Sequence, residues 1–326
     1  MKKCNLFIDG GTTNTRFVLL DGKNEKVIAR MERKVGASST ESSDANEKLK
    51  LSVKDAIYRL ETENGCRIEN IYASGMITSN AGLYELPHID APAAVENLKN
   101  GIEKVYLPEI SRDVPFQFFP GIKFQNQPEI GFDMMRGEEV EIYGALEPED
   151  YQKSILFIHF GSHNKLIFVE DGIIRNAITT ISGELLWAIV TETILKSSIG
   201  NFEEPFTMDP SYIEMGYRET KESSISRSLF VARIHQVINE ATHEQVKSYL
   251  YGAITFLDLQ VFSKLMTKET DKMILYGREN FIKAFRHCMR FVEEGQLEKI
   301  PIEEISFEES EKLSVQGIQA ILSDCL

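Results

Sequence analysis

The sequence "LFIDGGTTNTRFVLLDG" (residues 6–22) places two apolar runs on either side of a short polar turn. The first run ends at Asp9, and the turn that follows is built from Gly11, Thr12, Thr13 and Asn14. Small residues in such a turn let backbone N–H groups approach an anion, and hydroxyl groups add further donors. Taken alone, the stretch is compatible with an ordinary hairpin or with a phosphate-binding turn.

A second copy of this stretch favours the phosphate-binding interpretation. Residues 156–172, "LFIHFGSHNKLIFVEDG", match it without a gap. The identical positions in the two copies are Leu6, Phe7, Ile8, Gly11, Asn14, Asp21 and Gly22, which recur as Leu156, Phe157, Ile158, Gly161, Asn164, Asp171 and Gly172. Each copy predicts a strand, a Gly-hydroxyl turn, a second strand, a tight Asp-Gly hairpin and a third strand. Two unrelated hairpins are the alternative, but the matching context indicates a duplicated domain.

Composition sets the class of protein. A length of 326 residues predicts two domains, given ~100–200 residues per domain. A hydrophobic fraction of 42% with 26% charged residues is typical of a soluble globular protein. The net charge of −14 argues against nucleic-acid binding. Apolar runs are too short for a membrane helix, the start lacks a signal peptide, and the scattered cysteines indicate neither disulfides nor zinc, so we expect a cytoplasmic protein.

Apolar spacing predicts the remaining elements. We expect strands at 70–76, 116–122 and 272–277, and helices at 46–63, 92–104, 136–146, 182–195, most of 222–267, 278–294 and 310–324. Pro92 is expected in the first turn of its helix and Ser182 at an N-cap. Strands that alternate with helices predict an α/β fold with partly parallel sheets.

Several motifs resemble those of one enzyme family in order and spacing. They are "DGGTTNTR" (9–16), "SGMITSNAGLYELPHIDAPA" (74–93), "PGI" (120–122), "DMMRGEEVEIYGAL" (133–146), "FGSHNK" (160–165) and "TTISGELL" (179–186). Together they resemble the 2-dehydro-3-deoxygalactonokinase family of keto-deoxy sugar-acid kinases. Three aromatic positions of the family pattern differ, because Gly10, Leu83 and Leu166 stand where tryptophans are expected near the cleft.

The resemblance implies an α/β, two-domain actin-like ATPase fold, a duplicated ribonuclease H-like unit with a central cleft. Residues 1–143 would form the acceptor and phosphate domain, with the C-terminal helix 310–326 packing back onto it. Residues 144–309 would form the nucleotide-binding domain. The implied substrates are ATP, with Mg²⁺, and a small sugar acid. The two domains would close around them and exclude water.

The phosphate-binding roles follow from the two turns. Asp9 is the expected Mg²⁺ ligand, because a hard cation prefers carboxylate oxygens and water, although an Asx-turn is the alternative. Gly11, Thr12, Thr13 and Asn14 would hold the phosphates from one side. The second domain would contribute Gly161, Ser162, His163 and Lys165, with Gly277 beside the nucleoside. The alternative for Lys165 is a solvated surface lysine.

The expected base is Glu138, whose segment also resembles the catalytic-glutamate segment of exopolyphosphatases, with Asp133 as the reserve. Simple stabilisation of a helix N-terminus is the alternative for Glu138. A sugar-acid carboxylate suits a guanidinium, so Arg16 and Arg136 are candidates, alongside Ser79 and Asn80. A strand-edge ion pair is the alternative for Arg16. His159 and His163 lie across a strand and turn, which argues against a metal pair.

Three functions are compatible with these features. The leading hypothesis is an ATP-dependent kinase that phosphorylates 2-dehydro-3-deoxy-D-galactonate, or a close analogue, at its primary hydroxyl. A phosphatase or polyphosphatase on the same fold is the second, and a catalytically altered nucleotide-binding sensor is the third. A homodimer is compatible with each of them.

Overall fold

A computed structural model describes residues 2–23, 26–37, 43–127, 130–266, 269–292, 297 and 299–323. The N-terminal half contains a sheet of order β3-β2-β1-β4-β7-β6. Its strands are β1 (Lys2–Gly10), β2 (Thr15–Asp21), β3 (Val27–Arg33), β4 (Cys66–Gly75), β6 (Glu103–Val105) and β7 (Phe116–Phe118). The first three form an antiparallel meander, and β4 pairs parallel with β1.

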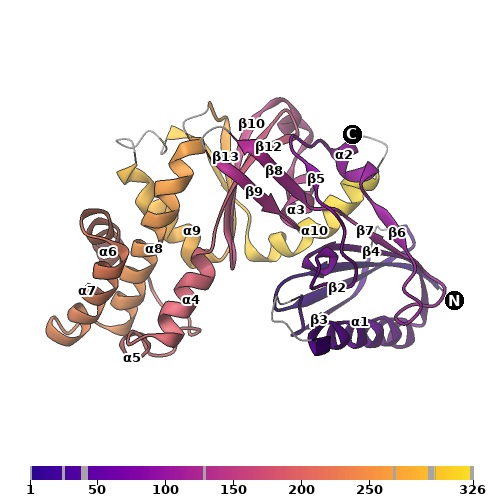
Figure 1. The fold of residues 1–326 in the computed structure, drawn as a ribbon, viewed down its shortest axis with the longest axis horizontal. Coiled ribbons are helices and arrows are strands. Elements are labelled where there is room, and N and C mark those ends of the chain that lie inside the picture. Colours follow the sequence, from indigo (N-terminus) through magenta and orange to yellow (C-terminus); the bar gives the residue numbers. More distant parts are fainter. Residues whose placement is uncertain are drawn as a thin grey trace.

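The C-terminal half repeats this topology in a sheet of order β12-β11-β10-β13-β14. Its strands are β10 (Ser154–Phe160), β11 (Asn164–Glu170), β12 (Ile173–Thr180), β13 (Lys272–Gly277) and β14 (Ile302–Glu304). The meander is again antiparallel, and β13 pairs parallel with β10. The predicted duplication and partly parallel sheets are therefore confirmed, and the fold is the two-domain actin-like ATPase fold (Figure 1).

Helices cover both faces of each sheet. On the outer faces lie α1 (Ser43–Asn64) in the first half and α8 (His243–Met266) with α9 (Glu279–Cys288) in the second. Two helices, α3 (Glu138–Ala145) and α10 (Phe307–Leu322), pack in a core that both inner faces share. The strands are apolar on both faces for this reason: Phe157 of β10 enters the shared core, while Ile158 enters the outer one.

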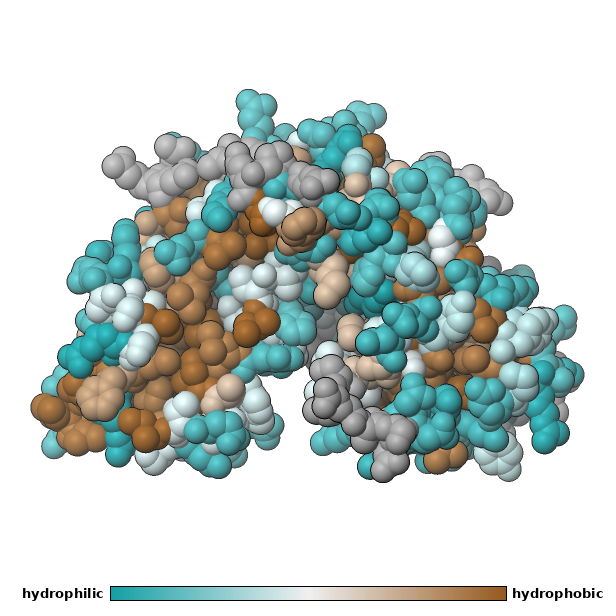
Figure 2. All heavy atoms as spheres, viewed as in Figure 1, coloured by the Kyte–Doolittle hydropathy of each residue, from teal (hydrophilic) through white to brown (hydrophobic). Residues whose placement is uncertain are grey.

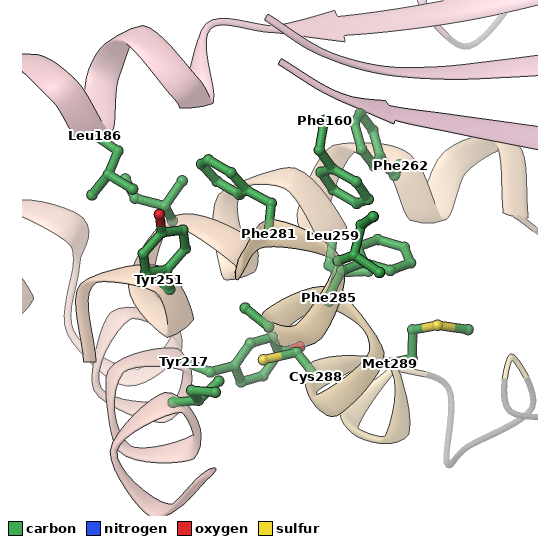
Figure 3. Close-up of a cluster of buried hydrophobic side chains, with 14 of the residues drawn as sticks. Phe160, Leu186, Tyr217, Tyr251, Leu259, Phe262, Phe281, Phe285, Cys288 and Met289 are labelled. Atoms are coloured by element: carbon green, nitrogen blue, oxygen red, sulfur yellow. The ribbon is translucent and has the colours of Figure 1, made fainter. Parts of the chain in front are cut away.

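Several aromatic side chains pack together in the outer core of the second half (Figure 3). Phe160 ends β10 and stacks on Phe281 of α9, with ring centroids 6.1 Å apart. Tyr251 of α8 meets the same Phe281 ring edge-on at 5.0 Å. These contacts join α8 and α9 to the strand that precedes the second turn.

The other elements lie at the periphery. A three-stranded sheet contains β5 (Ile89–Asp90), β8 (Ile122–Gln127) and β9 (Gly131–Met135), and α2 (Val95–Asn100) lies beside it. A helical lobe is formed by α4 (Ser182–Glu192), α5 (Lys196–Ile199), α6 (Pro210–Glu222) and α7 (Ile225–Ile238). Short 3₁₀ turns span Met76–Thr78, Pro148–Gln152 and Met289–Phe291.

Figure 2 shows a notch between the helical lobe and the N-terminal half. None of the helices in the described ranges could cross a membrane.

Several local predictions were wrong. The helix expected from Pro92 begins only at Val95, because the extended Ala94 caps it. Ile181, not Ser182, caps α4, and the hydroxyl of Ser182 instead donates to Asp258. The helix expected over 278–294 ends at Cys288.

The two hairpins also differ from each other. Asp171 and Gly172 form the expected tight turn, with φ of 52° and 72°. After Asp21, by contrast, β3 begins only at Val27, so that connection is longer than the tight hairpin predicted. The gapless alignment of the two copies is also shifted by one residue after the first turn, because Ile8 pairs with Phe17 while Ile158 pairs with Leu166. The second turn is therefore one residue shorter than the first.

The two inner helices touch at glycines. A Cβ atom on Gly317 of α10 would lie 1.8 Å from the Val140 carbonyl oxygen of α3. A Cβ atom on Gly144 of α3 would lie 2.1 Å from the Leu313 carbonyl oxygen of α10. The helices thus pack backbone against backbone. The predicted domain boundary after residue 143 falls within α3 itself.

We predict that Gly317→Ala destabilises the protein by about 1–3 kcal/mol, because the added methyl group overpacks this contact. In an exposed helix the same change would stabilise by up to about 1 kcal/mol. Urea denaturation measures the difference, with Gln316→Ala at a neighbouring exposed position as control. A Gly317→Ala protein as stable as the control would contradict the close packing.

Candidate active site

Glu138 is the first residue of α3 and lies between the two halves of the protein. Its Oε1 is 3.2 Å from Nζ of Lys165 on β11 and 3.8 Å from Nδ1 of His159 on β10. Its Oε2 accepts a hydrogen bond from the backbone N–H of Arg136 at 3.2 Å. Lys165 is only 5% exposed, so the alternative of a solvated surface lysine is wrong.

The ion pair controls how this group titrates. Burial alone would raise the pKa of Glu138, but Lys165 and His159 outweigh it and leave the pKa below its usual value. His159 is held neutral, since burial lowers its pKa to about 4 despite the attraction of Glu138. The carboxylate therefore stays ionised at neutral pH and can accept a proton.

Asp9 and Arg16 lie opposite each other on β1 and β2, with Nη1 of Arg16 3.6 Å from Oδ2 of Asp9. Arg16 also approaches Glu32 of β3 at 3.7 Å, so the strand ion pair considered for it is present. Burial raises the pKa of Asp9, and Arg16 partly offsets this. No described group of three acidic, His or Cys residues could enclose a metal. One carboxylate is nevertheless enough for Mg²⁺, which usually keeps water and phosphate ligands, so Asp9 fits that role.

The two turns are suited to bind an anion. In the first, the Gly11 N–H bonds the Asn14 carbonyl at 2.9 Å, which closes the turn. Within the described ranges, five turn N–H groups have no protein acceptor, those of Thr12, Thr13, Asn14, Ser162 and His163. Unpaired N–H groups in a turn are the donors that a phosphate requires. His163 also lies 3.4 Å from Glu184.

Two further glycines, which were not predicted as site residues, pack directly against the backbone of these turns. A Cβ on Gly36 would lie 2.5 Å from the Thr12 carbonyl oxygen, and one on Gly183 would lie 2.0 Å from the Gly161 carbonyl oxygen. Each follows the third strand of its copy. A glycine at the matching place in both copies was the sequence signal that could have found them.

A buried aspartate on α8 fixes the second turn. Asp258 is 1% exposed and accepts hydrogen bonds from Nδ2 of Asn164 at 2.7 Å, Oγ1 of Thr180 at 2.6 Å and Oγ of Ser182. Asn164 in turn accepts from the Gly161 N–H at 3.2 Å. Asp258 carries no local sequence signal, because it lies far along the chain inside a long helix.

Arg136 holds the loop after β4. Its Nη1 donates to the Thr78 carbonyl at 2.8 Å, and its Nη2 donates to the Leu86 carbonyl at 2.8 Å and lies 3.1 Å from Nδ1 of His88. Burial lowers the pKa of His88 to about 4, so the ring is neutral beside the guanidinium. Ser79 donates to the Met76 carbonyl at 2.7 Å, and its neighbour Asn80 is exposed.

The last two predicted residues have clear structural contacts. Both oxygens of Asp133 accept from Thr179, one from its N–H at 2.8 Å and one from its hydroxyl at 2.7 Å. Gly277 ends β13 with φ of 105°, and a Cβ there would lie 2.2 Å from the Phe160 carbonyl oxygen. Gly75 repeats this arrangement against Gly10 in the first half, where a Cβ would lie 2.6 Å from the Gly10 oxygen.

We predict that Asp258→Asn destabilises the protein by about 1–3 kcal/mol, because the new amide faces the Asn164 amide donor-to-donor. The double variant Asn164→Asp/Asp258→Asn restores one donor and one acceptor, so part of the loss should return. Chemical denaturation of the single and double variants measures the coupling. The exposed Asp113→Asn is the matched control and should change little. Strictly additive losses would exclude the pair as the support of the turn.

We predict that Lys165→Met raises the pKa of Glu138 above that of the wild type, because burial then acts without the ammonium charge. Carbon-13 NMR of the carboxyl group, assigned with Glu138→Gln, measures the shift. Lys165→Arg keeps the charge and should keep the pKa low. In the wild type the depressed pKa gives stability that is present above pH ~4.5 and lost as the pH falls through the folded value. An unchanged titration in Lys165→Met would refute the pairing.

One enzyme family matches this chain over most of its length. The family model described as 2-keto-3-deoxy-galactonokinase matches residues 9–301. A Rhizobium meliloti (strain 1021) protein named as a probable 2-dehydro-3-deoxygalactonokinase is 22% identical over 190 residues, which are 58% of this chain and 60% of that protein. The aligned part thus covers less than two thirds of that relative.

A solved structure from Sinorhizobium meliloti, assigned as a 2-dehydro-3-deoxygalactonokinase, has the same fold. It superimposes with a TM-score of 0.75 at 19% identity, over 97% of each chain. At that identity the likeness establishes the fold alone, while the family model spans most of the sequence. The chain therefore belongs to the 2-keto-3-deoxy-galactonokinase family.

Proposed function

We propose that this protein is an ATP-dependent kinase that phosphorylates a small sugar acid, 2-dehydro-3-deoxy-D-galactonate or a close analogue, at its primary hydroxyl. The observation that carries the proposal is the ionised Glu138, held by Lys165 at the point where the two halves meet. A turn with unpaired N–H donors precedes the second strand of each half. Membership of the family supports the same reaction.

The residues divide into three roles. The N–H groups of Thr12, Thr13, Ser162 and His163 bind the polyphosphate, and the Asp9 carboxylate would hold Mg²⁺, which neutralises phosphate charge when bound. Glu138 accepts the proton of the acceptor hydroxyl as it is lost, a contribution of about 10²–10⁴-fold.

Charge in the site assists the transfer. Lys165 keeps Glu138 ionised and places a cation next to the reacting phosphate oxygens. Asp133 is the weaker candidate for the base, because Thr179 already occupies both of its oxygens. Closure of the notch over the site would exclude water that otherwise hydrolyses ATP.

The acceptor is expected beside the loop after β4. The terminal nitrogens of Arg136 already contact Thr78, Leu86 and His88. These residues belong to the loop after β4, so we assign Arg136 the role of positioning Ser79 and Asn80 of the same loop. Arg16 remains the guanidinium for an anionic group, since its two ion pairs are both longer than 3.5 Å. Gly277 would lie beside the nucleoside.

The test is ADP release from Mg-ATP with a panel of keto-deoxy sugar acids, aldonates and neutral sugars. We expect turnover that depends on a sugar acid and falls at least about 10²-fold in Glu138→Gln, with a comparable loss in Asp9→Asn. Asp90→Asn, at an exposed strand end, is the control and should retain activity.

The outcomes separate the three functions. Phosphate release without any acceptor would establish a phosphatase instead. Nucleotide binding, seen by calorimetry, with no turnover on any acceptor would favour the sensor. Full activity of Glu138→Gln would remove Glu138 as the base.

A further inference from the structure

A cavity of about 220 Å³ lies between the inner face of β1–β3 and helix α10. Part of the lining is a row of polar side chains that crosses four neighbouring strands, Ser74, Asp9, Arg16 and Glu32. Apolar side chains complete the lining, Phe7 and Val18 from the sheet and Val315 and Ile318 from α10. The cavity adjoins the proposed phosphoryl-transfer site only through Asp9 and Arg16.

Two polar atoms of this lining lack a hydrogen bond. The hydroxyl of Ser74, a residue only 1% exposed, and Nε of Arg16 have no hydrogen-bond partner among the described residues. A buried donor left unpaired costs about 1–3 kcal/mol. Both residues line the cavity, so a ligand oxygen that reaches these atoms would satisfy them.

A comparison of the two halves shows why this cavity is not filled by the chain. In the C-terminal half, the strand pair β8–β9 covers the matching region of β12, where Gln127 bonds Ala177 and Asp133 bonds Thr179. In the described part of the N-terminal half, no element covers β3 in this way. The charged side chains of Arg30 on β3 and Glu311 on α10 also line the cavity.

We propose that this cavity binds a small hydroxycarboxylate, with its hydroxyl end at Ser74 and Arg16 and its carboxylate at Arg30. Arg30 is exposed and has no ion-pair partner among the described residues, so its guanidinium is available to a carboxylate. The volume lies below the ~300 Å³ at which pockets for drug-sized ligands begin, which favours a compact ligand. The class of ligand rests on the proposed function. The ligand is either the acceptor itself or a separate effector that acts through α10.

The test is calorimetry without nucleotide, using D-glycerate and 2-dehydro-3-deoxy-D-galactonate as probes. Ser314 lines the cavity from α10, so Ser314→Leu fills it, while Gln316→Leu places the same side chain at an exposed position of the same helix. We expect at least one probe to bind the wild type and Gln316→Leu, and its affinity to fall at least tenfold in Ser314→Leu. Thermal unfolding of both variants checks that they fold.

A second variant tests the carboxylate end. Arg30→Gln should weaken glycerate at least tenfold but leave binding of glycerol, which has no carboxylate, unchanged. Equal binding by Ser314→Leu and the wild type, or no binding of either probe to the wild type, would overturn the proposal.

Kinetics separate the two sources of ligand. If the cavity holds the acceptor, Ser314→Leu raises the acceptor KM at least tenfold while kcat changes little. If it holds an effector, the KM stays unchanged although glycerate binding is lost. Binding is measured without phosphoryl transfer, so it decides the proposal even if the protein proves not to be a kinase.

Discussion

The contact between α3 and α10 is the constraint on which the site depends. Glycines on both helices bring the backbones together, and a single Cβ at Gly144 or Gly317 would collide with a carbonyl oxygen. Each helix also packs in the core shared by the two sheets. Glu138 begins α3, so this contact fixes the carboxylate relative to the strands of both halves. The second half supplies the ion-pair partner Lys165, and each half places a turn with unpaired N–H groups before its second strand.

The duplicated scaffold carries different charges in its two copies. Asp9 pairs with Arg16 across β1 and β2, and His159 pairs with Lys165 at the matching place across β10 and β11. The first pair contributes an acid and a base that attract each other, while the second contributes a neutral ring and a buried cation. The second copy therefore directs its positive charge at Glu138, and the first retains the Asp9 carboxylate, which we propose as the metal ligand. One fold thus produces an asymmetric site from two similar turns.

The sequence predicted the duplication and most of the strands and helices, because strands and turns leave local signals. It did not predict Asp258, Gly36 or the partners of Arg136, whose contacts join residues distant in the chain. The gapless alignment also misplaced Leu166, which pairs like Phe17, because the apolar residues that follow Arg16 and Lys165 fit either register. The sequence also carried no sign that Lys165 is buried, because its partner Glu138 lies on α3, which is distant in the chain.

The three positions that depart from the family pattern lie in packed surroundings. Leu166 is fully buried in the outer core of the second half, and Leu83 is 8% exposed in that of the first. Gly10 is confined by the loop after β4, since a Cβ there would lie 2.5 Å from Cβ of Ile77. Each of these positions therefore leaves no room for a larger side chain unless its neighbours move. We propose that acceptor preference depends on where Arg136 holds the loop, because a displacement of that loop would move Ser79 and Asn80 relative to Glu138.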